Sequence, residues 1–251
     1  MVVKKGDFVK INYTCRVKET GELVETTLSE VAEKEGLHGR REGEAHSYEP
    51  MFIVLGEGWV PEGVEEALEG MDVGQEKTLE VPPEKGYGVR DPSKMRLLPL
   101  RKFSREGISP VPGMQVEVDG KPALIRSVGA GRVQVDFNHP LSGKSLVYEL
   151  KVESLIEETA ERVKAILHRR APSLDLEKTL IDVHEEDVSI EIPEDSFFIE
   201  GIQLIKRNVA SDIHKYLPGV KTVVFIERFT RPQVAVEAEQ RKASSPSGNE
   251  S

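Results

Sequence analysis

Cysteine and histidine are the side chains that most often serve as nucleophiles and metal ligands, and the candidates here are Cys15 and His139. Cys15 lies within residues 9–17, where polar and apolar residues alternate, and it falls on the apolar face of that predicted strand. A small buried residue is therefore favoured over a nucleophile. His139 has no second histidine at the spacing of a metal site, so a hydrogen-bonded turn residue is favoured over a metal ligand.

Hydroxyl groups are the other candidates for chemistry, and Tyr13, Tyr87 and Tyr148 carry them. Taken alone, each tyrosine is more simply a core aromatic residue whose hydroxyl has one hydrogen-bonding partner. The choice between a structural and a catalytic role therefore depends on the elements that position these side chains.

The most informative of these elements lies in residues 51–88. Apolar residues recur there at the spacing i, i+3, i+4 and i+7, which predicts a short helix with one apolar stripe. The stripe consists of Val64, Ala67, Leu68 and Met71. Pro61 stands where the first turn of a helix tolerates proline. Alone, this pattern predicts a helix that packs against a sheet.

Several groups of residues in this segment agree in order and spacing with the FKBP-type peptidyl-prolyl isomerases, which the chain resembles. They are Met51–Gly56, Val60–Met71, Val73–Gln75 and Gly86–Gly88. The resemblance implies an α+β fold with an FKBP-type antiparallel sheet around a short helix. It also implies an apolar pocket that isomerises an X-Pro bond by desolvation and shape selection, so no cofactor, metal or general base is expected.

The resemblance implies three catalytic tyrosines, Tyr13, Tyr87 and Tyr148, and Tyr87 would donate its hydroxyl to a substrate carbonyl. The implied substrate-binding residues are Val24, Glu25, Met51, Ile53, Val60, Pro61 and Val64. Pro61 is the most serious departure from the family pattern, because the family commonly offers a backbone N–H there and proline has none. Whether macrolide inhibitors bind is therefore open. Trp59 has three interpretations: it lines the pocket mouth, anchors the loop or packs partly in the core.

The start of the chain predicts a strand at 7–17 and a returning strand at 23–27, similar to the opening hairpin of the family. Residues 28–49 are polar and contain a possible helix at 29–35, so we expect an insertion beside the pocket. Together with residues 138–153, residues 1–90 are expected to form the isomerase domain.

Residues 91–137 have a different character, with short predicted strands at 114–118, 123–128 and 132–137 that are separated by glycine and proline. The predicted strand 145–152 then closes the first domain, so a small β-rich domain is inserted into it. This layout resembles the SlyD-like FKBPs, whose insert-in-flap domain captures unfolded client chains. Residues 138–144, Asn-His-Pro-Leu-Ser-Gly-Lys, are similar to the motif with which that subgroup re-enters the isomerase domain.

An apolar cluster at the start of this insert has two interpretations of equal weight. Its members are Met95, Leu97, Leu98 and Leu100. They can bind client chains, or they can form the small core of the insert, and both can hold for different residues.

Residues 154–230 predict a separate α+β C-terminal domain with the order α-β-β-α-β. Its first helix is expected to begin with Ser154 as its cap, and its second helix, at 197–217, is expected to bury Phe198. This domain lies outside the SlyD resemblance, and the whole layout looks like the long-chain archaeal FKBPs, in which such a domain is associated with dimerisation. Residues 231–251 lack an apolar period and are expected to be disordered.

Composition and charge argue against several classes of function. The net charge of -10 disfavours nucleic-acid binding. No window approaches the apolar length of a membrane span, and the start of the chain lacks the apolar core of a signal peptide. One cysteine permits no internal disulfide, which agrees with a reducing compartment. We therefore expect a cytoplasmic protein with neither membrane nor nucleic acid as a partner.

The leading functional hypothesis is a peptidyl-prolyl cis-trans isomerase joined to a client-binding insert. Its partners would be unfolded or partly folded chains that contain X-Pro bonds, together with a second copy of this chain in a homodimer formed through the C-terminal domain. The alternative is a holdase-type chaperone or a scaffold with a weak or vestigial pocket, motivated by Glu25, Met51 and Pro61.

Overall fold

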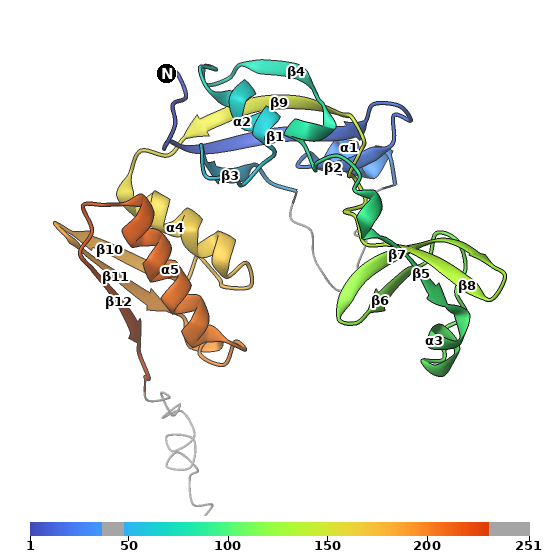
Figure 1. Ribbon diagram of the computed structural model, residues 1–251. Coiled ribbons are helices and arrows are strands. Elements are labelled where there is room, and N and C mark those ends of the chain that lie inside the picture. Colours follow the sequence, from blue (N-terminus) through green and yellow to red (C-terminus); the bar gives the residue numbers. More distant parts are fainter. Residues whose placement is uncertain (37–47, 231–251) are drawn as a thin grey trace, which may run out of the picture. The chain divides into compact units, whose positions relative to one another are not determined.

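The structure is a computed structural model that describes residues 1–36 and 48–230, and it divides into two compact units (Figure 1). The first unit, Met1–Glu157, contains a five-stranded and a four-stranded sheet, and the second unit, which begins at Glu158, contains a three-stranded sheet. Helices accompany all three sheets, which confirms the α+β class. The tail predicted to be disordered, and much of the predicted insertion 28–49, lie outside the described residues.

The five-stranded sheet is built around β1 (Phe8–Val17) and β9 (Leu146–Leu155), which pair antiparallel along almost their whole lengths. β2 (Leu23–Thr26) and β3 (Met51–Val54) also pair with β1, and β4 (Glu76–Val81) pairs with β9. The strand order is therefore β2-β1-β9-β4, with β3 beside β1. Alternation of apolar and polar residues predicted β1, and the hairpin and closing strand that the family resemblance implied are β2 and β9, so all three predicted strands are confirmed.

A short helix, α2 (Glu62–Leu68), packs its apolar stripe into the core that this sheet covers. Pro61 directly precedes the helix, and Gly70 follows it with a φ of 84°, a left-handed value that residues other than glycine rarely adopt. The predicted stripe is confirmed, because Val64, Ala67, Leu68 and Met71 are all buried. The predicted helix at 29–35 is also confirmed as α1 (Ser29–Lys34).

The four-stranded sheet contains β5 (Met95–Pro99), β6 (Gln115–Val118), β7 (Lys121–Gly129) and β8 (Arg132–Asp136), in the order β5-β8-β7-β6. The strands expected at 114–118, 123–128 and 132–137 are confirmed. Tight two-residue turns join β6 to β7 and β7 to β8, and all four turn residues have positive φ, as such hairpins require.

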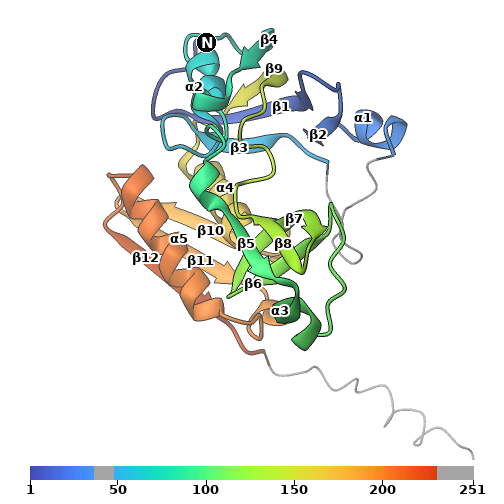
Figure 2. The ribbon, with the colours of Figure 1, turned by 45° about the vertical axis from the view of Figure 1, so that its right-hand side comes forward.

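Two elements of this sheet were not expected from the sequence. The run that begins at Met95 forms the strand β5, and it continues directly into a helix, α3 (Leu100–Arg105), which Figure 2 shows below the end of β5. Phe103 of this helix is fully buried and forms a separate small core with β6, β7 and β8. The insert therefore has a hydrophobic core of its own.

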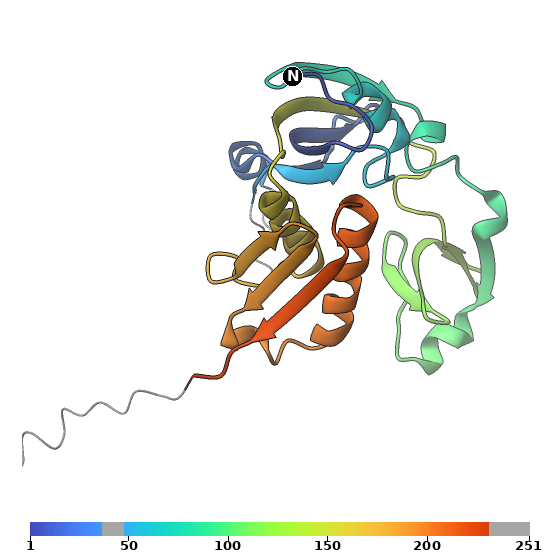
Figure 3. The ribbon, with the colours of Figure 1, turned by 90° about the vertical axis from the view of Figure 1, so that its left-hand side faces the viewer.

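The second unit contains α4 (Thr159–Arg170), β10 (Leu180–His184), β11 (Asp187–Ile192), α5 (Ile202–Tyr216) and β12 (Thr222–Glu227), so the predicted order α-β-β-α-β is confirmed. β10 pairs antiparallel and β12 parallel with the central strand β11. Both helices cover one face of the sheet, and β12 lies at its edge (Figure 3).

Two local predictions for this unit are wrong. Ser154 does not cap a helix, because β9 continues through Leu155 and α4 begins only at Thr159. The helix expected from residue 197 begins at Ile202, because the chain first forms a short 3-10 helix and then reaches Gly201 in the left-handed region. Phe198 therefore lies outside the helix and is 88% exposed, whereas burial was expected.

Candidate active site

Two of the three candidate tyrosines lie on the central pair of strands. Tyr13 is on β1 and Tyr148 is on β9, and both point into the core of the first unit, where their ring centroids are 6.0 Å apart with an interplanar angle of 43°. Cys15 follows on the same face of β1 and is paired in register with Tyr148. The alternation of the strand thus brings two hydroxyls and a thiol to one place.

The hydroxyl groups of this cluster interact with one another. The Tyr148 hydroxyl lies close enough to the Cys15 thiol and the Tyr87 hydroxyl to alter their pKa values, and the Glu25 carboxylate does the same to the Tyr13 hydroxyl. Burial is the main reason that the pKa values of the three tyrosines are raised, and the charge of Glu25 adds to the increase at Tyr13. All three hydroxyls are therefore neutral at physiological pH, so they can donate hydrogen bonds but cannot act as bases.

Cys15 belongs to this cluster as a buried residue, as the sequence indicated. Burial raises the pKa of its thiol, although the nearby Tyr148 hydroxyl opposes this effect. A protonated thiol is a poor nucleophile, so the site contains no activated nucleophile at this position.

The apolar residues expected around the tyrosines fall into two groups. Ile53 on β3 and Val64 on α2 are almost completely enclosed, so they support the site from the packed core. The others pack against that core but retain some accessible surface, namely Val24, Met51, Val60, Tyr87 and the unpredicted Leu141. The candidate site therefore consists of hydroxyl groups on the packed core with partly accessible apolar side chains around them.

Trp59 and Pro61 lie on either side of Val60 at the start of α2. The Trp59 ring packs edge-on against Phe52 with centroids 5.4 Å apart, which supports partial core packing among the three interpretations. The Pro61 carbonyl accepts hydrogen bonds from the N–H groups of Val64 and Glu65, at 2.8 and 3.1 Å. This bonding starts the helix. Proline itself has no backbone N–H, so residue 61 offers no donor to a ligand.

Tyr87 reaches the cluster from the loop that follows a 3-10 helix at Pro83–Lys85. Its backbone carbonyl accepts a 2.9 Å hydrogen bond from Ser142 Oγ, and its ring stacks on the ring of His139 with centroids 4.5 Å apart and an interplanar angle of 2°. The Leu141 N–H donates to His139 Nδ1, so the turn interpretation of His139 is confirmed. The stack itself was missed, because nothing in the sequence relates residues 52 positions apart.

The four apolar residues at the start of the insert differ in burial, so the core interpretation applies to only some of them. Leu98 and Leu100 pack against the core around Phe103, whereas Leu97 is 60% exposed and Met95 is half-buried. Further exposed apolar side chains of the insert are Val111, Met114 and Val128.

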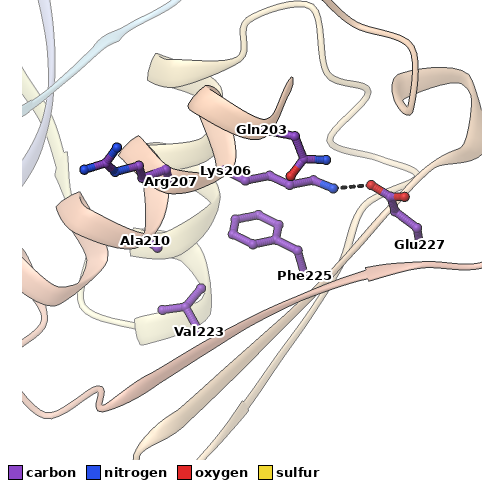
Figure 4. Close-up of a pocket in the computed structure, with 7 residues that line it drawn as sticks. All are labelled: Gln203, Lys206, Arg207, Ala210, Val223, Phe225 and Glu227. Atoms are coloured by element: carbon purple, nitrogen blue, oxygen red, sulfur yellow. Dashed lines mark hydrogen bonds and ion pairs between the residues drawn. The ribbon is translucent and has the colours of Figure 1, made fainter. Parts of the chain in front are cut away.

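A separate groove of about 520 Å³ lies in the second unit, between α5 and the edge strand β12 (Figure 4). Phe225 lines it from β12, and Lys206 of α5 crosses above that ring to form an ion pair with Glu227. None of the candidate tyrosines lies in this unit.

Within residues 1–36 and 48–230, no three histidine, cysteine or acidic side chains gather closely enough to hold a metal ion. In the same residues, no helix has the length and apolar character needed to cross a membrane.

Comparison with protein families assigns all three parts of the chain. The model for FKBP-type peptidyl-prolyl cis-trans isomerase matches residues 1–102, that for the FKBP26 IF domain matches 96–141, and that for the FKBP26 C-terminal region matches 159–230. Together these models cover residues 1–141 and 159–230, and the segment between them, which contains β9, is not matched.

Among individual proteins, the chain is similar to a short-type peptidyl-prolyl cis-trans isomerase of Methanocaldococcus jannaschii, with 40% identity over 154 residues, which is 61% of this chain and 94% of that protein. It is also similar to SlyD, an FKBP-type isomerase of Helicobacter pylori, with 31% identity over 49% of this chain and 68% of that protein. An FKBP-type 16 kDa isomerase of Escherichia coli is 30% identical over 41% of this chain and 72% of its own length.

Proposed function

The chain belongs to the FKBP-type peptidyl-prolyl cis-trans isomerases, and from this premise we propose that it catalyses X-Pro isomerisation between Tyr13, Tyr87 and Tyr148 and accelerates proline-limited folding of other proteins. The observation that carries the proposed site is the cluster of neutral hydroxyls, two of them on buried tyrosines, that is surrounded by apolar side chains. Polar donors enclosed in this way suit a reaction that needs neither a nucleophile nor a base.

The proposed chemistry follows from the planarity of the amide. Rotation about the C–N bond costs roughly 18 to 20 kcal/mol, because the double-bond character of the planar amide must be lost. The planar amide is more charge-separated than the twisted one, so an apolar environment raises the ground state relative to the transition state. Val24, Met51 and Val60 would supply this environment, and the Tyr87 hydroxyl would position the bound chain by donating to one of its carbonyls outside the rotating amide.

The assay for this site is isomerisation of a proline-containing tetrapeptide by the full chain and by Tyr87→Phe. Loss of one ordinary hydrogen bond raises the barrier by about 0.5 to 1.5 kcal/mol, so we expect kcat/KM to fall by a factor of roughly 2 to 10. Phe229→Leu, at an exposed position of the second unit, serves as the control and should turn over normally. Unchanged turnover in Tyr87→Phe would show that the proposed site is wrong.

We propose that the insert binds client chains through its exposed apolar side chains, chief among them Leu97 and Val128. A client held there raises the effective concentration of its X-Pro bonds near the pocket without any new contact at the reacting bond. The burial of the apolar residues at the start of the insert supports this role. Leu98 and Leu100 pack against the core of the insert, whereas Leu97 is not part of that core.

A specific feature also favours the second candidate, a holdase or scaffold with a weak pocket. Pro61 offers no N–H to a bound chain, and its carbonyl is already used to start α2. The two candidates differ in the tetrapeptide assay, because a holdase would delay aggregation of an unfolded protein without isomerising the peptide.

We further propose that the C-terminal domain forms a homodimer. Leu204 at the start of α5, Phe198 before it and Phe229 after β12 are large exposed apolar residues, and surfaces of this kind are typical of subunit contacts. The test is the solution mass of the full chain and of a chain that ends at Glu157. A monomeric full chain at micromolar concentration would exclude the dimer, and a truncated chain that remains dimeric would place the contact in the first unit.

A cytoplasmic location and the absence of nucleic-acid partners stay predictions. The buried free thiol of Cys15 is compatible with a reducing compartment, and the net charge of -10 disfavours polyanions.

A further inference from the structure

The insert is joined to the rest of the first unit by two segments that are bonded to each other. On the way out, the Gly88 carbonyl accepts a hydrogen bond of 2.9 Å from the Gly143 N–H. Further along, Asp91 and Asn138 form a reciprocal pair, since the Asp91 N–H donates to Asn138 Oδ1 and Asn138 Nδ2 donates to the Asp91 carbonyl, each at 2.9 Å. The outgoing segment 87–91 and the returning segment 136–143 thus form one junction.

A buried carboxylate lies at the centre of this junction. Asp136, the last residue of β8, is 1% exposed, and burial of a carboxylate is costly unless all its acceptor sites are bonded. Its Oδ1 accepts from the N–H and Nδ2 of Asn138, at 2.9 and 2.7 Å. Its Oδ2 forms ion pairs with Arg90 of the outgoing segment and, at 3.0 Å, with Arg126 of β7.

The identity of these partners is informative. Arg126 would be sufficient to anchor Asp136 within the insert, because β7 and β8 are neighbours in one sheet. The other donors come from the two connecting segments, so the carboxylate joins the sheet of the insert to the chain that enters and leaves it. A residue needed only for the core of the insert would not require the contacts to Arg90 and Asn138.

The returning segment of the junction contacts Tyr87 of the proposed pocket. His139 follows Asn138 in the chain, and its ring stacks on the Tyr87 ring. Three residues later, Ser142 Oγ binds the Tyr87 carbonyl. Close approach of the two segments also requires glycine at 143, where the φ is 78° and a side chain would meet Arg90 at 3.3 Å.

We propose that Asp136 is a positioning residue for isomerisation: by binding Arg90 and Asn138 at once, it sets the place of His139 and thereby the place of the Tyr87 ring. The proposal rests on the proposed catalytic role of Tyr87. It makes the junction, and not only the pocket walls, a determinant of the catalytic rate.

The test follows the Tyr87 ring and the rate separately in the full chain. In Asp136→Asn the amide group must turn its NH₂ toward either Asn138 or the two arginines, so one set of donors loses its acceptor. Arg90→Ala removes a contact from the partly exposed side of the junction, and it decides the question if Asp136→Asn fails to fold. Asp119→Asn is the matched control, since Asp119 is an exposed aspartate of the insert that pairs with Lys102 and not with the junction.

The first measurement is the ¹⁹F spectrum of chains labelled with 3-fluorotyrosine at all five tyrosines, with Tyr87 assigned from Tyr87→Phe. His139→Ala gives the position of the Tyr87 resonance without the stack. We expect the Tyr87 resonance to move toward that position in Asp136→Asn and Arg90→Ala but not in Asp119→Asn. The second measurement is kcat/KM on a tetrapeptide, which should fall by a factor of roughly 2 to 10 in the same two variants.

A Tyr87 resonance at its wild-type position in every junction variant that folds would overturn the proposal, because Asp136 would then serve only the structure of the insert. Failure of the proposed pocket has a different signature. In that case Tyr87→Phe turns over normally, while the resonance still reports whether Asp136 positions the ring.

Discussion

In the pocket, hydroxyl groups are enclosed among apolar side chains, whereas in the insert apolar side chains such as Leu97 and Val128 remain exposed to solvent. A site that acts on one bond gains from excluding water and from fixed donors. A surface that binds unfolded chains of many sequences, as we propose for the insert, needs exposed apolar side chains without fixed geometry. If the two regions divide catalysis from client binding in this way, substitutions in one should leave the other function intact.

The largest effect is expected from Tyr148→Ala, which removes a buried ring next to Tyr13 on the central strand pair. Truncation of a buried aromatic residue costs about 3 to 5 kcal/mol in the free energy of unfolding. Denaturant unfolding of the full chain measures this loss in the first unit. Leu180→Ala, at an exposed side chain of the second unit, should cost far less, and equal losses would mean that Tyr148 does not pack as described.

The second-largest effect is expected in client binding, and it tests whether catalysis and client binding are separate. Replacing both Leu97 and Val128 with Ser should weaken client binding about tenfold or more, because burial of a single Leu or Val side chain contributes about 1.5 to 3 kcal/mol. Catalysed refolding of a proline-limited protein should slow accordingly, while tetrapeptide turnover stays at the wild-type level. Glu117→Ser, an exposed polar position in the same sheet, is the control. A parallel loss in both assays would contradict the division of roles.

A smaller effect is expected for the pair Tyr13 and Glu25. Tyr13→Phe removes one hydroxyl and should lower kcat/KM on a tetrapeptide by a factor of roughly 2 to 10. Because Glu25 lies close enough to raise the pKa of Tyr13, Glu25→Gln combined with Tyr13→Phe should cost less than the sum of the single changes. Additive losses in this double-mutant cycle would show that the two side chains act independently.

The smallest effect concerns alkaline stability. The folded-state pKa values of Tyr13, Tyr87 and Tyr148 are raised above the value of about 10 that these side chains have in the unfolded chain. Above pH 10 the unfolded state loses these protons first, so the stability they contribute is lost as the pH rises toward the folded-state values. Chemical unfolding between pH 8 and about pH 11 should show this decline. Tyr148→Phe should flatten the decline, whereas an unchanged slope would exclude a raised pKa at this residue.

Much of the fold of the first unit was predictable, because its signals are local. The alternation in β1 and the stripe on α2 each lie within one element, and Gly70 marks the end of α2 with a backbone conformation that only glycine adopts easily.

In the second unit, the start of α5 was placed too early, because Phe197 and Phe198 extend the apolar pattern although Gly201 interrupts the helix. Periodicity alone does not reveal such a break.

In the candidate site, too, only some of the features could be predicted from the sequence. Tyr13, Tyr87 and Tyr148 were identified through motifs with fixed spacing, and Cys15 was correctly interpreted as buried. The contact of Tyr87 with His139 could not be predicted, because it depends on how the chain returns from the insert. In the insert, β5 was missed because a short strand with exposed Leu97 resembles an apolar surface cluster.

The pairing of β1 with β9 has a consequence for the synthesis of this protein. The two strands are the central pair of their sheet, yet the whole insert is translated between them. The strands of the insert are joined by tight turns and are close in sequence, so we expect them to fold first on the ribosome. The sheet that carries Tyr13 cannot form completely until β9 has been synthesised. Of the three candidate tyrosines, Tyr148 is the last to be translated. An isomerase of this design thus completes its proposed active site only after its insert has been synthesised.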